Sequence, residues 1–184
     1  GLYNGLVLLV DDETNSYWDH ITGEAVHGAL AGKATLEIDS LETTTVAAEL
    51  ARSPDTQVLV GELGLIGTLA SKVQASSVRG KGVLPPGFRK TMGEMDERLP
   101  YGETGLGVVV GEVARFFPSA RLESSGWTGD MAGRRLHVRL REDRVPFATW
   151  VDDGTRPFQL FTRWYGFSFT YPGCEIAEST QSQT

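Results

Sequence analysis

Residues 105–117 read GLGVVVGEVARFF, and this stretch decides the fold class of the chain. Two apolar runs flank Gly111 and Glu112, and short apolar runs separated by a glycine-containing turn are typical of a β-hairpin. We therefore predict two antiparallel strands that meet at these two residues. Because each apolar run has the length of a strand rather than of a helix, the stretch favours a β-rich fold.

A second pair of strands is predicted beyond this hairpin. In RRLHVRLRED (residues 134–143), Leu136, Val138 and Leu140 alternate with His and Arg side chains. Successive side chains of a strand point to opposite faces, so this strand has one apolar and one polar face. The VPFATWV stretch that follows (residues 145–151) has the length of a strand and is predicted to be its partner.

Aromatic side chains gather in the last third of the chain, where residues 147–171 hold nine of the seventeen. We expect this segment to close the hydrophobic core, because aromatic side chains bury large areas. The alternative is a docking surface for a protein partner or for lipid headgroups, since Trp, Tyr and Arg dominate binding hot spots. The partner-binding candidates in this segment are Phe158, Phe161, Arg163, Trp164 and Tyr165.

The first third of the chain predicts strands around one helix. The helix is expected within LETTTVAAELARS (residues 41–53), capped by Thr43 or Thr44 and followed by Pro54. Three stretches predict strands: residues 6–10 (LVLLV, buried), 34–39 (ATLEID, half-buried) and 56–61 (TQVLVG).

Residues 64–105 differ from the rest because they are rich in Gly, Ser and Pro and show weak periodicity. Such composition predicts a long loop or an insertion. Together the elements predict an α+β, β-rich single domain with short helices and a long Gly/Ser/Pro-rich middle loop. Within residues 1–184 we expect an acidic β/α part (1–63), the loop or insertion (64–105), a β-rich aromatic part (106–176) and a polar tail (177–184).

The 184 residues carry a net charge of −7, and this charge is unevenly distributed. Residues 1–62 contain eleven acidic and two basic residues, a net charge of −9. Such a surface repels a phosphate backbone, so we expect no nucleic-acid partner. No apolar run approaches the roughly 20 residues of a membrane-spanning helix, so no transmembrane segment is predicted.

Three consecutive acidic side chains follow the first predicted strand and raise the question of a metal site. Hard cations bind where several oxygen atoms converge from one loop, but the oxygen spacing and central glycine of an EF-hand are missing here. The two nearby histidines have no third ligand close in sequence. The candidate ligands for a divalent ion are Asp11, Asp12, Glu13, His20 and His27. A hydrolase that uses Asp11, Asp12 or His20 is a less favoured hypothesis.

We prefer a structural interpretation of the same stretch, in which its polar side chains form a turn. Short polar side chains are the usual turn formers because they hydrogen-bond to nearby backbone groups. Asp12 is expected to accept backbone N–H bonds, Thr14 and Ser16 to cap the turn, and Trp18 to pack. Cys174 is the single cysteine and has no His close in sequence, so we expect a structural thiol rather than a nucleophile.

A set of motifs extends over most of the chain outside residues 64–100. It includes SPDTQVLV (residues 53–60), GLGVVVGEVARFFP (105–118) and RWYGFSFTYPGCEI (163–176). Together with the most specific motif, at the start of the chain, these stretches resemble a bacterial family that is known as a domain of unknown function, DUF3179. The positions that carry the first part of the resemblance are Leu2, Tyr3, Asn4, Asp12, Thr14, Ser16, Trp18, Gly23, Gly28, Gly32 and Leu36.

The resemblance implies a compartment more than an activity. Members of this family are typically exported bacterial proteins, which implies the periplasm or the outer face of the membrane. Many members carry a CPLC-like cysteine motif upstream of the Leu-Tyr-Asn block, which implies redox or metal chemistry. The chain begins at Gly1 inside that block and shows no such motif. We therefore expect either that a segment has been removed or that the chain is part of a longer product.

The sequence favours a non-enzymatic function without a cofactor. We expect an accessory or structural subunit that docks on a protein partner, as part of a membrane-bound complex on the periplasmic side. The alternative is a periplasmic metal-binding or redox protein, with a divalent metal ion as cofactor, whose cysteine motif has been lost or lies outside the chain.

Overall fold

The computed structural model of the chain describes residues 2–3, 6–59, 61 and 88–178. Most of the predicted middle loop (residues 64–105) and of the polar tail (177–184) therefore lies outside the described residues. Within the described residues the fold is β-rich, with three sheets and two short α-helices. No helix of this part is long and apolar enough to cross a membrane.

The central sheet is built on the hairpin predicted at Gly111 and Glu112. Its strands run in the order β10 (Phe158–Arg163), β5 (Thr104–Val110), β6 (Val113–Pro118) and β11 (Glu175–Ile176). The strands β5 and β6 pair antiparallel from Gly105 opposite Pro118 to Val110 opposite Val113, which confirms the predicted hairpin. Gly111 turns the chain with a φ of 57°, a left-handed conformation that glycine adopts at little cost.

The second sheet consists of β7 (Trp127–Met131), β8 (Arg134–Leu140) and β9 (Pro146–Trp150), all antiparallel. The predicted alternation in β8 is confirmed, because Leu136 and Val138 are fully buried whereas Arg139 is exposed. The two sheets enclose the larger core cluster. Its buried members are Leu106, Val108, Phe117, Met131, Leu136, Val138, Ala148, Trp150 and Ala177.

The other face of the central sheet is covered by α3 (Trp164–Thr170). The ring of Phe167 lies directly over Gly107, where any β-carbon would clash with it. Phe116, fully buried on the same face, packs its ring 5.2 Å from that of Trp164. The period of two in β5 and β6 therefore sends alternate side chains into two cores, one on each face of the sheet.

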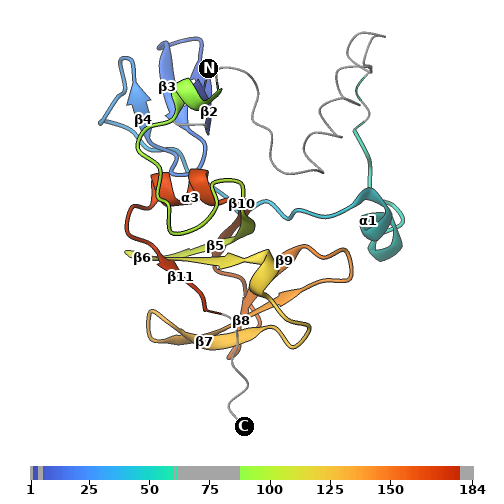
Figure 1. The fold of residues 1–184 in the computed structure, drawn as a ribbon. Coiled ribbons are helices and arrows are strands. Elements are labelled where there is room, and N and C mark those ends of the chain that lie inside the picture. The colour runs from blue at the N-terminus through green and yellow to red at the C-terminus, as the bar shows by residue number, and fades with distance from the viewer. Residues whose placement is uncertain (1, 4–5, 60, 62–87, 179–184) are drawn as a thin grey trace.

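A third sheet lies on the far side of α3 (Figure 1). It is an antiparallel meander of β1 (Leu2–Tyr3), β2 (Leu6–Asp11), β3 (Ser16–Asp19) and β4 (Ala25–His27). Leu6 reaches α3 at Gly166, where a β-carbon would lie 3.0 Å from Cδ2 of the leucine. Figure 1 thus shows four layers: the β7–β9 sheet, the central sheet, α3 and the N-terminal sheet.

The predictions for the first third of the chain are only partly correct. Residues 6–10 do form a strand, but only Leu6 is buried, while Val7 and Leu9 are 55% and 52% exposed. The strands predicted at residues 34–39 and 56–61 are wrong for the residues that the structure describes, and residue 60 lies outside them. In the first stretch, residues 34–36 hydrogen-bond to Gly23 and Ala25 beside β4, but this pairing stops at the single bridge between Glu24 and Thr35 and does not extend into a ladder. The described residues of the second stretch form no strand.

The helix predicted within residues 41–53 exists as α1 (Val46–Arg52). Its N-cap is Thr45, one residue later than the later of the two predicted caps, and the Thr45 side chain accepts the N–H of Ala48. None of its residues is buried, and it projects to the side of the layered body (Figure 1). Two 3₁₀ turns, η1 (Phe88–Thr91) and η2 (Ser119–Arg121), complete the described structure.

Candidate docking site

The acidic stretch after β2 forms a hydrogen-bonded turn in which Asp11 is the central acceptor. One carboxylate oxygen of Asp11 accepts the N–H of Glu13 at 2.8 Å, and the other accepts the hydroxyl of Thr14 at 2.5 Å. These bonds, with that of Thr14 first, lower the pKa of Asp11 below its usual value. Asp12, which we expected in this role, is exposed.

Ser16 and Trp18 continue this turn into β3. The hydroxyl of Ser16 lies 2.7 Å from that of Thr14 and accepts the N–H of Leu30 at 3.1 Å. Trp18 is only 6% exposed. The two Asp11 oxygens therefore hold the turn, and Ser16 fastens it to the loop after β4.

The two histidines of this region lie in different environments. Nδ1 of His20 lies 2.7 Å from the carbonyl oxygen of Val7, whereas the His27 ring meets the ring of Tyr17 edge-on at 5.6 Å. The structure therefore does not join them with the acidic turn. Within residues 6–59 and 88–178, no group of three or more His, Cys, Asp or Glu side chains could hold a metal ion.

The aromatic candidates divide between the core and the surface. Trp164 is fully buried and donates its indole N–H to the carbonyl of Asp96 at 2.8 Å, which removes it from the predicted partner surface. Phe161 is 37% exposed, and Phe158 and Arg163 are half-buried on the same strand, β10. Tyr165 is half-buried on α3 and lines a different cavity. The segment therefore both closes the core and presents part of one strand to solvent.

A groove of about 270 Å³ brings several of these residues together. One wall is β10 with Phe158 and Phe161, and another is the turn after β3 with His20. The third wall belongs to a segment without regular structure, residues 38–45, which we call the strap. Leu41 on the strap is 88% exposed. We take this groove as the candidate docking site.

The strap is fixed to the sheets by polar bonds rather than by burial. Ser40 accepts the N–H of Gln159 at 2.9 Å with its hydroxyl. The buried Gln159 side chain in turn accepts the N–H of Ala148 at 2.8 Å and donates to its carbonyl at 2.9 Å, so it joins β10 to β9. The strap is thereby tied to the point where the two body sheets meet.

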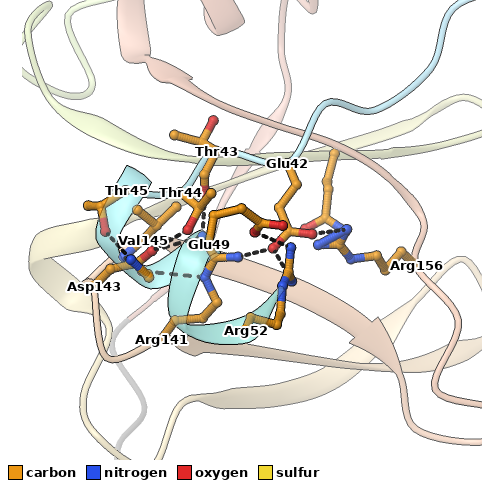
Figure 2. Close-up of polar contacts among 12 residues, drawn as sticks. Glu42, Thr43, Thr44, Thr45, Glu49, Arg52, Arg141, Asp143, Val145 and Arg156 are labelled. Carbon is orange, nitrogen blue, oxygen red and sulfur yellow. Dashed lines mark hydrogen bonds and ion pairs between the residues drawn. The ribbon is translucent and has the colours of Figure 1, made fainter. Parts of the chain in front are cut away.

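Glu42 makes the strongest attachment of the strap, and Figure 2 shows three guanidinium groups converging on its carboxylate. Arg52 donates to it at 2.9 Å and Arg156 at 3.1 Å, while Arg141 forms a third ion pair. Arg141 also donates to the carbonyl of Thr43. Arg141 and Arg156 lie 99 and 114 residues beyond Glu42, so these pairs link distant parts of the chain.

A second carboxylate, that of Asp143, completes this cluster (Figure 2). It accepts the hydroxyl of Thr44, a guanidinium N–H of Arg141 and the N–H of Val145, each at 3.1 Å. Burial opposes ionisation of Glu42 and of Asp143, but their hydrogen bonds and the nearby arginines outweigh it, so both pKa values are lowered. Side chains that stay ionised in this way hold the strap in place and are poorly matched to proton transfer near neutral pH.

No pattern in the sequence indicated the Glu42 cluster or the Gln159 bridge. Their partners are far apart along the chain, and arginines and carboxylates are common on any surface. The apolar character of Phe158 and Phe161 was the only local signal for the groove.

The family model described as "Protein of unknown function (DUF3179)" matches residues 1–149. The search of curated proteins and the search of solved structures found no match.

Proposed function

This chain belongs to the family of proteins of unknown function DUF3179, and we propose that it is a non-enzymatic docking subunit. In this proposal it binds a larger, membrane-associated protein complex on the periplasmic side. The strap and the groove beside β10 form its docking site.

The observation that carries the proposal concerns the strap, which exposes an apolar side chain to solvent although ion pairs hold its backbone in place. Leu41 is 88% exposed, although the residue after it is fastened by three ion pairs. Large exposed apolar surface is costly in water and marks interaction sites when it is contiguous. A segment that is already ordered loses little conformational entropy on binding, which favours affinity.

The surroundings of Leu41 supply further apolar surface and a negative charge. Phe161 is 37% exposed on the opposite wall of the groove, and Asp39 lines the same groove. Glu37 is exposed nearby in the sequence. We therefore expect the partner to insert an apolar side chain that is flanked by Lys or Arg, because complementary charges favour association.

Co-purification from the membranes of the source bacterium tests this proposal. Tagged chain is incubated with detergent-solubilised membranes, and the recovered proteins are compared among the wild type, Leu41→Ser and Phe161→Ser. We expect one defined partner with the wild type and its loss with both variants. The matched control is Val151→Ser, because Val151 is 54% exposed and does not line the groove.

The unfolding free energy of each variant is measured alongside. Leu41→Ser is expected to change it by about 0.5 kcal/mol or less, because the side chain is almost fully in solvent. Equal recovery of the partner with all variants would refute the groove as the docking site. A wild-type chain that recovers no partner would refute the docking function.

A further inference from the structure

A second and larger cavity lies between α3, the turn after it and the segment that precedes β5. Its volume is about 470 Å³. In Figure 1 the green segment that enters β5 passes beside α3. The walls come from residues 92–96 of that segment and from residues 165–173, at α3 and the turn after it.

Two of the three methionines of the chain, Met92 and Met95, line this cavity and are half-buried. The third, Met131, is fully buried in the larger core. A methionine whose role is to fill space in a core is expected to be buried, as Met131 is. The thioether side chains of Met92 and Met95, three residues apart, instead line one cavity, and methionines also occur on adaptable binding surfaces.

The charge around these thioethers is negative. Glu94 and Asp96 line the cavity, and the described residues of its lining include no Lys, Arg or His. Arg98 donates to Asp96 at 2.6 Å from outside the lining and keeps that carboxyl ionised. Tyr165 and Phe169 supply aromatic walls, and aromatic faces attract cations.

The segment that carries the thioethers is anchored at its end. The carbonyl of Asp96 accepts the indole N–H of Trp164 at 2.8 Å, and Arg98 donates to the carbonyl of Cys174 at 2.9 Å. Leu99 then enters the smaller core at 7% exposure. The methionines therefore stand on a short segment whose position against α3 is set by the core.

We propose that Met92 and Met95 bind a soft monovalent metal ion, copper(I), through their thioether sulfur atoms. Thioethers are soft ligands that select copper(I) over harder cations such as magnesium or calcium. The open side of the cavity leaves further coordination positions for ligands from solution, with the carboxylate of Glu94 beside them. This site shares no residue with the docking groove and does not depend on the docking function.

Cys174 is the competing soft ligand and must be separated from the methionines. It is 5% exposed, does not line the cavity, and burial raises the pKa of its thiol to about 11. A thiol has to lose its proton to bind a metal, whereas a thioether has none to lose. Copper(I) bound by the methionines should therefore keep its affinity between about pH 7 and about pH 5, where a thiol or imidazole site weakens.

The test is a titration of the purified full chain with copper(I) under reducing, oxygen-free conditions, in competition with a coloured copper(I) chelator. Silver(I), which does not change oxidation state, is titrated separately and followed by the intrinsic fluorescence. We expect one ion per chain and a loss of affinity of about tenfold or more in Met92→Leu/Met95→Leu, since even outer-shell changes at metal sites cost that much.

Two matched variants keep the result interpretable. Met131→Leu makes the same substitution in the core, and Cys174→Ser removes the thiol; both are expected to bind copper(I) like the wild type. Met-to-Leu changes conserve volume and leave the fold intact. The proposal is overturned if the wild type shows no saturable binding. It is equally overturned if the double variant binds normally, or if binding disappears in Cys174→Ser.

Discussion

The N-terminal region (residues 6–59) exposes most of its large apolar side chains, whereas the body (residues 99–177) buries most of them wholly or in part. Within the described residues, fourteen of the eighteen buried apolar residues belong to the body, and ten of the twelve large exposed ones belong to the N-terminal region. The body thus gains its stability from two filled cores, one on each face of the central sheet. The N-terminal region is held largely by turns and ion pairs, and much of its apolar surface is exposed; in the proposed function this surface meets the partner.

The largest expected loss of stability follows from removing an aromatic ring from the core of the body. Phe116 is fully buried between the rings of Trp164 and Phe167, at 5.2 and 5.5 Å. We expect Phe116→Ala to lower the unfolding free energy by about 3–5 kcal/mol. Leu9→Ala removes an exposed side chain and should cost about 0.5 kcal/mol or less. Urea unfolding of both variants measures the contrast, and equal losses would contradict it.

The next largest loss of stability is expected from adding a side chain where α3 packs closely on β5. A β-carbon at Gly107 would clash with the ring of Phe167, so we expect Gly107→Ala to cost about 1–3 kcal/mol. Gly61→Ala is the control, because no atom of the described residues lies within 4 Å of a β-carbon at that position. Thermal unfolding compares the two variants. If Gly107→Ala is no less stable than Gly61→Ala, then α3 does not pack on β5 as described.

The attachment of the strap is expected to contribute less than either core. Glu42→Gln keeps the shape of the side chain and removes the negative charge that pairs with three arginines. The Glu42 side chain is 24% exposed, so water partly screens these pairs. We expect a loss of about 1–2 kcal/mol, a range that allows for partial screening by water. The loss should shrink in about 1 M salt, which screens charges. Glu37→Gln, at an exposed position, is the control and should change little.

Acid should weaken the same attachment. The pKa of Glu42 is lowered from its ordinary value of 4.5 and that of Asp143 from 3.8. At acidic pH the folded chain therefore binds fewer protons at these two groups than the unfolded chain does. Their contribution to stability is therefore complete above about pH 4.5 and is lost as the pH falls through the lowered values. Unfolding free energies at a series of pH values should fall less steeply in Glu42→Gln. An unchanged slope would contradict this account.

The sequence predicted the body better than the N-terminal region, for a physical reason. Both of its strongest signals are local: the alternation in β8 indicates which face is buried, and the glycine turn at Gly111 indicates where two strands meet. The run of residues 6–10 is apolar throughout, so it could not show that only Leu6 would be covered. In residues 34–39 the alternation is present, but the pairing with residues 23–25 is limited to one bridge, and a strand forms only where its ladder is completed.

The candidate sites were predictable only in part. Phe158 and Phe161 were identified by residue type, but Trp164, chosen by the same criterion, is buried in the core between α3 and the central sheet. The turn after β2 was predicted with Asp12 as its acceptor, whereas Asp11 has this role. The contacts of Glu42 with Arg141 and Arg156 join residues about a hundred positions apart and leave no trace in local sequence.

The most direct test of the central claim is site-specific photo-cross-linking of the full chain in native membranes. A photoreactive amino acid is placed at position 41 on the strap, and in a second variant at position 151, which is also exposed. The docking account predicts a defined cross-linked protein from position 41, lost when Phe161→Ser is added, and no such product from position 151. No cross-link from position 41, or the same product from both positions, would contradict it.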